Sequence, residues 1–189
     1  MGVQNGQFVA GDSDTFVVYG EFGSIESAKQ PGAPNYSQWD QRHGGIDFAA
    51  KFGTDVVASA PGKVVYVGTF EGTSVTVDVG GGYYTTYSHL SATNVTVGQH
   101  VNSGDKIGAV GNSGTTNPHL HFEVDRVEGK TVWACNPHKF FNQAEYNQHI
   151  KLDSAANHFS EGDRDNADAQ PDFQWNSAWK GYFLEAVGK

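Results

Sequence analysis

Between residues 43 and 124, hydrophobic and polar residues alternate in short stretches that are separated by glycines and polar turns. Residues 74–79 show this best, because three valines alternate with threonine and aspartate, which is the period of a strand with one buried face. The triplet Gly80-Gly81-Gly82 follows and predicts a hairpin turn. By the same criteria we expect strands at residues 16–19, 55–59, 63–70, 74–79, 83–88, 105–110 and 119–124.

The spacing of these strands predicts an all-β domain. No segment long enough for a crossover helix separates them, so neighbouring strands should pair mostly antiparallel. Residues 23–42 contain two prolines and two glycines without periodicity and predict a long surface loop, which is often functional in a compact domain. We therefore divide the chain into a lead-in (1–14), a β domain (15–141) and a C-terminal extension (142–189).

The C-terminal extension has a different pattern. Residues 142–159 are compatible with a helix, and residues 160–172 are acidic and loop-like. Trp175, Trp179, Phe183 and Ala186 then follow at spacings typical of one apolar helix face. The favoured interpretation is that this face packs on its own domain. The alternative is a docking face for another segment or for the target surface.

Composition and charge exclude several functional classes. The chain has 189 residues, no apolar run near the roughly 18 residues of a membrane span, and a net charge of −9 with 12 lysines and arginines. We therefore expect neither nucleic-acid binding nor membrane insertion. Cys135 is the single cysteine, which excludes an internal disulfide framework. The first ten residues lack the features of a signal peptide, so we expect another export route or a module of a longer chain.

Histidines in the predicted strands suggest a metal centre. His119 and His121 would project from the same face of a strand, whereas a helix would place them about 200° apart. His43 and Asp47 are four residues apart and would share a face of extended chain. His89 ends the stretch 83–89, where it would share a face with residues 85 and 87.

Two imidazoles and one carboxylate are the usual protein ligands of a catalytic zinc ion, which leaves a fourth position open. Calcium and magnesium prefer oxygen ligands, so the histidines favour zinc. There is no HExxH motif, which excludes the thermolysin-type arrangement. The spacing does not decide which of His119 and His121 binds the metal. A chance His-x-His pair, or a β-barrel binding module with a structural metal, stays open at this point.

Taken together, the motifs resemble one known family. The segments HGGIDFAA, GTDVVASAPGKVVYVG, YYTTYSHL, VGQHVNSGDKIGAVGNSG and NPHLHFEV closely resemble the lysostaphin-type (LytM-like) zinc metalloendopeptidases, which cut bacterial peptidoglycan peptides. Asn136-Pro137 is similar to the motif that closes the family's domain, so the resemblance covers about residues 16–141. It implies a compact, barrel-sandwich-like antiparallel β fold with a narrow groove over the zinc.

The resemblance also implies the roles of individual residues. It makes His43, Asp47 and His121 the ligands of one catalytic Zn²⁺ ion, and His89 and His119 the catalytic pair beside it. The division of base and stabiliser roles within the pair stays open.

In some relatives a tyrosine upstream of the first zinc histidine stabilises the transition state. Tyr36 is the candidate here, with an exposed loop residue as the alternative.

These observations predict a monomeric zinc endopeptidase that hydrolyses peptidoglycan cross-bridges or stem peptides through a metal-activated water. It would act on the bacterial cell wall as a secreted enzyme, a phage lysin or a virion-associated enzyme. The alternative is a non-catalytic peptidoglycan-binding or regulatory relative of the same fold.

Overall fold

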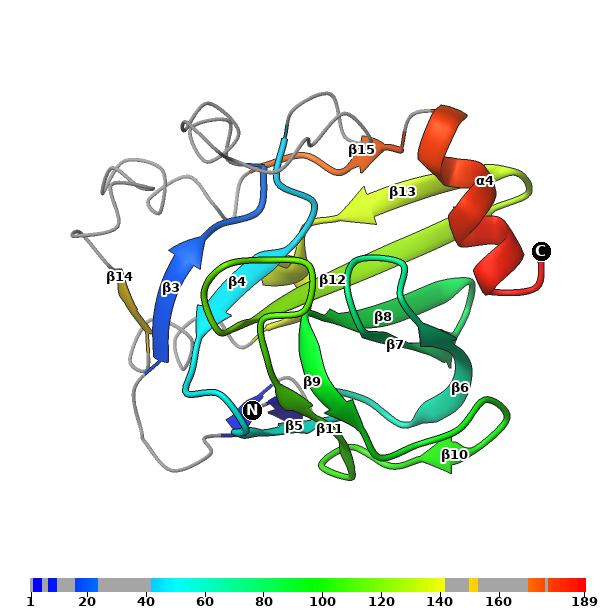
Figure 1. Cartoon of the computed structure of the whole chain (residues 1–189). Helices are drawn as coiled ribbons and strands as arrows, with labels where there is room; N and C mark the ends of the chain where they lie inside the picture. The colour runs from blue at the N-terminus through cyan, green and yellow to red at the C-terminus, as the bar shows by residue number, and fades with distance from the viewer. Residues whose placement is uncertain are drawn as a thin grey trace.

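The computed structural model describes residues 2–4, 7–9, 16–23, 42–141, 150–152, 170–175 and 177–189, and strands dominate it (Figure 1). The strands are β1 (Gly2–Gln4), β2 (Gln7–Val9), β3 (Phe16–Gly20), β4 (Ile46–Ala49), β5 (Asp55–Val57), β6 (Gly62–Gly68), β7 (Ser74–Gly80), β8 (Tyr83–Ser88), β9 (Leu90–Thr93), β10 (His100–Val101), β11 (Lys106–Val110), β12 (His119–Glu128), β13 (Thr131–Cys135), β14 (Ile150–Leu152) and β15 (Phe173–Gln174). The helices are the short 3₁₀ helix η2 (Pro137–Phe140) and α4 (Ser177–Ala186).

The predicted all-β architecture is confirmed. The main sheet has the strand order β10-β6-β7-β8-β12-β4-β3-β14, and β13 and β15 extend it from β12. Strands β5, β11 and β9 form a second, smaller sheet, and β1 pairs with β2. Among the described pairs, all are antiparallel except β3 with β14.

Strand β12 lies at the centre of the main sheet, and its alternate residues point to opposite faces of that sheet. Leu120, Phe122 and Val124 point into the hydrophobic core, as the alternation predicts. His119, His121, Glu123 and Asp125 occupy the alternate positions, and all four are buried. The face of β12 that points away from the hydrophobic core therefore carries buried polar side chains.

The C-terminal extension departs from the prediction in one place. Residues 150–152, within the stretch expected to be helical, form β14 beside β3, because pairing with a sheet edge overrides a weak local preference. The rest of residues 142–159, like most of the expected loop 23–42, lies outside the described residues.

Helix α4 begins only at Ser177, so Trp175 precedes it rather than sharing its face. Trp175 and Phe183 are 3% and 2% exposed and pack together with ring centroids 4.9 Å apart. Phe183 also meets Tyr84 of β8, edge to face. These aromatic residues thus pack on their own domain, in keeping with the favoured interpretation of the apolar pattern.

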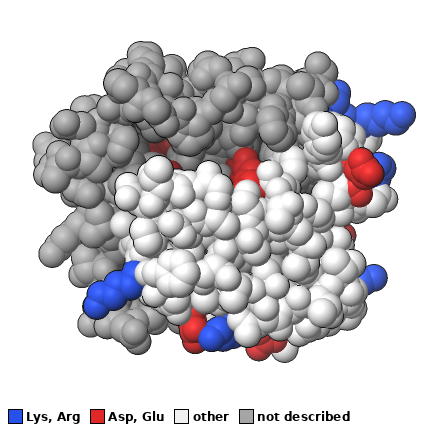
Figure 2. Space-filling view, in the orientation of Figure 1, with Lys and Arg blue, Asp and Glu red and all other residues white. Residues whose placement is uncertain are grey.

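Among the described residues, charged side chains are sparse on the face shown in Figure 2. The lysines and arginines visible there lie around its rim, and one acidic group lies in a hollow near its centre. Among the described residues this face therefore offers no basic stripe for a phosphate backbone. No described helix is long and apolar enough to cross a membrane.

Candidate metal centre

The pairing of β4 with β12 brings together the two halves of the predicted site. Asp47 lies directly opposite His121 in the antiparallel register, with Ile46 opposite Phe122 and Phe48 opposite Leu120. Paired residues point to the same face of a sheet, so Asp47 and His121 project together while their neighbours enter the core. The register of the sheet thus joins two parts of the site that the sequence had predicted separately.

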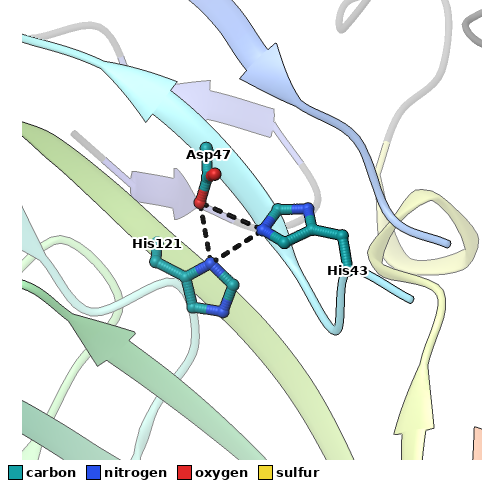
Figure 3. A group of neighbouring side chains, drawn as sticks. All are labelled: His43, Asp47 and His121. Carbon is teal, nitrogen blue, oxygen red and sulfur yellow. Dashed lines mark hydrogen bonds and ion pairs between the residues drawn. The ribbon is translucent and has the colours of Figure 1, made fainter. Parts of the chain in front are cut away.

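His43, Asp47 and His121 converge on one point (Figure 3). His43 Nε2 lies 3.1 Å from His121 Nδ1 and 3.2 Å from Asp47 Oδ1, and the last two atoms are 2.7 Å apart. All three residues are buried. Tetrahedral zinc with bonds of about 2.0–2.1 Å holds neighbouring ligand atoms about 3.3 Å apart, so the set fits zinc after a small expansion.

Hydrogen bonds on the far side of each imidazole fix which nitrogen faces this point. His43 Nδ1 donates to the carbonyl oxygen of Glu21 at 3.0 Å. His121 Nε2 donates to Glu123 Oε1 at 3.0 Å, with Glu71 Oε2 at 3.7 Å. When neutral, each ring therefore turns a lone pair toward the other two ligands, the arrangement that metal-binding histidines require.

The electrostatics of the cluster favour positive charge. Burial alone would raise the pKa of Asp47, but His43, His119 and the hydrogen bond from His121 hold it well below its ordinary value. Burial would lower the pKa of His121, but Asp47 and Glu123 raise it well above its ordinary value. A pocket that stabilises a carboxylate and a protonated imidazole also suits a bound cation.

Two further histidines lie beside the three ligands. The His119 and His89 ring centroids are 4.5 Å apart, and His89 lies 5.8 Å from His121. His119 Nδ1 donates to the carbonyl oxygen of Asn117, and His89 Nδ1 donates to that of Ser113. Both rings therefore keep Nε2 as a proton acceptor.

Burial keeps both imidazoles of this pair uncharged. Burial, with the nearby charges of His121 and His119, lowers the pKa of His89 to about 3. Burial also lowers the pKa of His119. Both imidazoles are neutral at pH 7 and can accept a proton.

The expected strand position of His89 is wrong. Strand β8 ends at Ser88, and His89 has φ of 63°, which a non-glycine residue rarely adopts. In the β8–β12 register Ser88 lies opposite His121, whereas Tyr87 lies opposite core residue Phe122. Continued alternation would have pointed His89 toward the core side, and the left-handed turn brings its ring back to His119 and His121.

Some site residues were missed from the sequence, and one prediction is not tested. Glu123 was detectable, because it is two residues beyond His121 on the same strand face. Glu71 lies in a turn and Glu21 directly follows β3, both far from the ligands in sequence, and neither carries such a signal. Tyr36 lies outside the described residues.

Comparison with known proteins identifies one matching family and several similar proteins. Residues 41–134 match the model of peptidase family M23. The chain is 44% identical over 93 residues to the peptidoglycan DD-endopeptidase ShyA of Vibrio cholerae, covering 48% of this chain and 21% of that protein. It is 34% identical over 112 residues to the murein hydrolase activator NlpD of Salmonella typhimurium, covering 58% and 29%. The chain thus spans less than a third of the length of these relatives.

A solved structure extends the comparison beyond the matched segment. The antimicrobial peptidase lysostaphin from Staphylococcus simulans superposes with a TM-score of 0.59 at 28% identity, covering 76% of this chain and 57% of that one. The fold implied by the sequence motifs is therefore confirmed.

Proposed function

The chain belongs to peptidase family M23, and from this premise we propose that it is a zinc-dependent endopeptidase that hydrolyses peptide bonds in bacterial peptidoglycan. The observation that supports this best is the convergence of His43, Asp47 and His121, with two neutral imidazoles beside them. The similarity to ShyA, a peptidoglycan DD-endopeptidase, supports the substrate class. Action at the bacterial cell wall, as a monomeric secreted, phage-lysin or virion-associated protein, belongs to the same proposal.

The chain's own residues divide into two groups in this mechanism. His43, Asp47 and His121 hold the zinc ion, which when bound supplies Lewis acidity that activates water and polarises a carbonyl group. His89 and His119 both present Nε2. One ring takes a proton there from the attacking water, and the other donates to developing negative charge only once its own Nε2 is protonated, or the roles are reversed. The carbonyls of Ser113 and Asn117 keep both rings in the required tautomer.

A regulatory role is the alternative, and NlpD, named as a hydrolase activator, motivates it. This chain retains a complete set of candidate ligands and both neighbouring histidines, which favours catalysis.

Digestion of purified peptidoglycan distinguishes the two functions. An enzyme releases soluble peptides, loses this activity in a chelator and regains it when zinc is added back. Mass spectrometry of the fragments then identifies the bond that is cut. Zinc-loaded protein that releases no peptide from intact walls or defined fragments would refute the proposed hydrolysis.

A further inference from the structure

A buried hydrogen-bonded network lies behind His43, on the side of its ring that faces away from Asp47 and His121. The carbonyl oxygen of Glu21 accepts the Nδ1–H of His43 at 3.0 Å. The backbone N–H of Gly23 donates to the carbonyl oxygen of His43 at 2.8 Å. Residues 21–23 therefore hold this ligand through its ring and its main chain.

The side chain of Glu21 is itself held in place. His138 Nε2 donates to Glu21 Oε2 at 2.8 Å, and both side chains are only 1% exposed. A buried carboxylate that loses its hydrogen-bond donor is costly, and the chain around it shifts to reach water or another partner. The position of the Glu21 carbonyl, and with it that of His43, consequently depends on His138.

His138 is positioned by the start of helix η2 and by the C-terminal extension. Asn136 caps this helix and accepts the backbone N–H of His138 at 3.1 Å. The backbone N–H of Asn136 donates to Asp172 Oδ1 at 2.8 Å, and its side-chain amide donates to the carbonyl oxygen of Gln170 at 3.0 Å. The network thus reaches from the extension to the metal centre.

The supporting residues lie outside the segment that matches the family model, residues 41–134. They come from the end of β3, from η2 and from the stretch before β15. The family match therefore accounts for the ligands and leaves the support of His43 unassigned.

We propose that Glu21 and His138 are positioning residues for the zinc ligand His43. They keep the proton of its neutral ring on Nδ1, so that the lone pair of Nε2 points at the metal position. Without the Glu21–His138 pair, the carbonyl acceptor shifts and the proton redistributes between the two nitrogens. A fraction of the protein then has no lone pair at Nε2. This inference rests on the proposed metal site and is independent of peptide hydrolysis.

Three variants test the inference. His138→Leu removes the donor, and we expect the zinc dissociation constant to rise about 10- to 100-fold, the usual effect of losing such support. His138→Gln carries an amide N–H where Nε2 was and should bind zinc within about twofold of the unmodified protein. Ile107→Val changes a fully buried core residue of β11 and serves as the control for general destabilisation. Competition with a chromophoric chelator, well below every unfolding temperature, gives the constants.

Nuclear magnetic resonance of the zinc-free protein measures the tautomer of His43, which a general loss of stability would not change. Long-range ¹H–¹⁵N spectra should show His43 as the Nδ1–H tautomer in the unmodified protein and in His138→Gln. They should show a tautomer mixture in His138→Leu. If His138→Leu does not fold, His138→Asn replaces it, because its shorter amide stops short of Glu21.

The proposal is wrong if His138→Leu keeps both the zinc affinity and the single His43 tautomer. It is equally wrong if Ile107→Val weakens zinc binding as much as His138→Leu does. Failure of zinc-loaded protein to cut peptidoglycan would refute the proposed function and leave these two readouts unaffected.

Discussion

Gly20 is the position where a single methyl group should disturb the metal centre most directly. A Cβ atom added there would lie 2.2 Å from Oδ2 and 2.6 Å from Cγ of Asp47. Ordinary contact begins near 3.4 Å, so the carboxylate of Asp47 must move by about 1 Å. Overpacking of this kind costs about 1–3 kcal/mol. At about 2–4 °C per kcal/mol for a chain of this size, Gly20→Ala should lower Tm by about 2–12 °C.

The displacement should also weaken metal binding, because ligand sets tolerate errors of only about 0.5 Å. We expect the zinc dissociation constant of Gly20→Ala to rise at least about tenfold. Gly181→Ala is the matched control: nothing lies within 4 Å of its added Cβ, and alanine favours the helix α4 by about 1 kcal/mol. Calorimetry and chelator competition compare the two. Equal Tm and zinc affinity in Gly20→Ala and the unmodified protein would refute this reasoning.

Three further predictions follow from the site and its surroundings. His89→Ala should retain zinc but lose about 10²–10⁴-fold in turnover, whereas Asp47→Ala should lose both zinc and turnover; equal metal content and cleavage in both would contradict the assignments. Burial and the charges of neighbouring glutamates raise the pKa of Asp125, so the folded protein keeps a proton that the unfolded chain releases above about pH 3.9. Stability therefore falls as the pH rises above about 4, and urea unfolding at a series of pH values should show Asp125→Asn gaining on the unmodified protein as the pH rises. Burial and nearby carboxylates raise the pKa of the Cys135 thiol to about 12, so alkylation at pH 8, followed by mass spectrometry, should be about a thousandfold slower in the folded than in the unfolded protein.

Local alternation predicted the strands that have one buried face. The stretches 74–79 and 83–88 were found almost to the residue, as β7 and β8. Strand β10 was not predicted, because two residues are too few to show a period. Strand β14 was not predicted either, since its pairing with β3 joins segments more than a hundred residues apart. Such long-range pairing leaves no trace in local sequence.

The site was predictable in its parts but not in its assembly. The alternation in β12 predicted that His119 and His121 share a face. The register that places Asp47 opposite His121 joins residues 74 apart and follows only from the folded sheet. The choice of His121 over His119 as a ligand came from the family resemblance. The turn at His89 was not predicted, because only a small fraction of non-glycine residues, histidines included, adopt a positive φ.

The hydrogen bonds that position His43 decide which residues an engineered fusion of this domain must contain. A designer who copies only the segment recognised by family similarity takes the ligands but leaves behind Glu21, His138 and the cap at Asn136. In such a shortened domain, the proton of the His43 ring would be shared between Nδ1 and Nε2. A fusion should therefore also include residues 16–23 and 135–175.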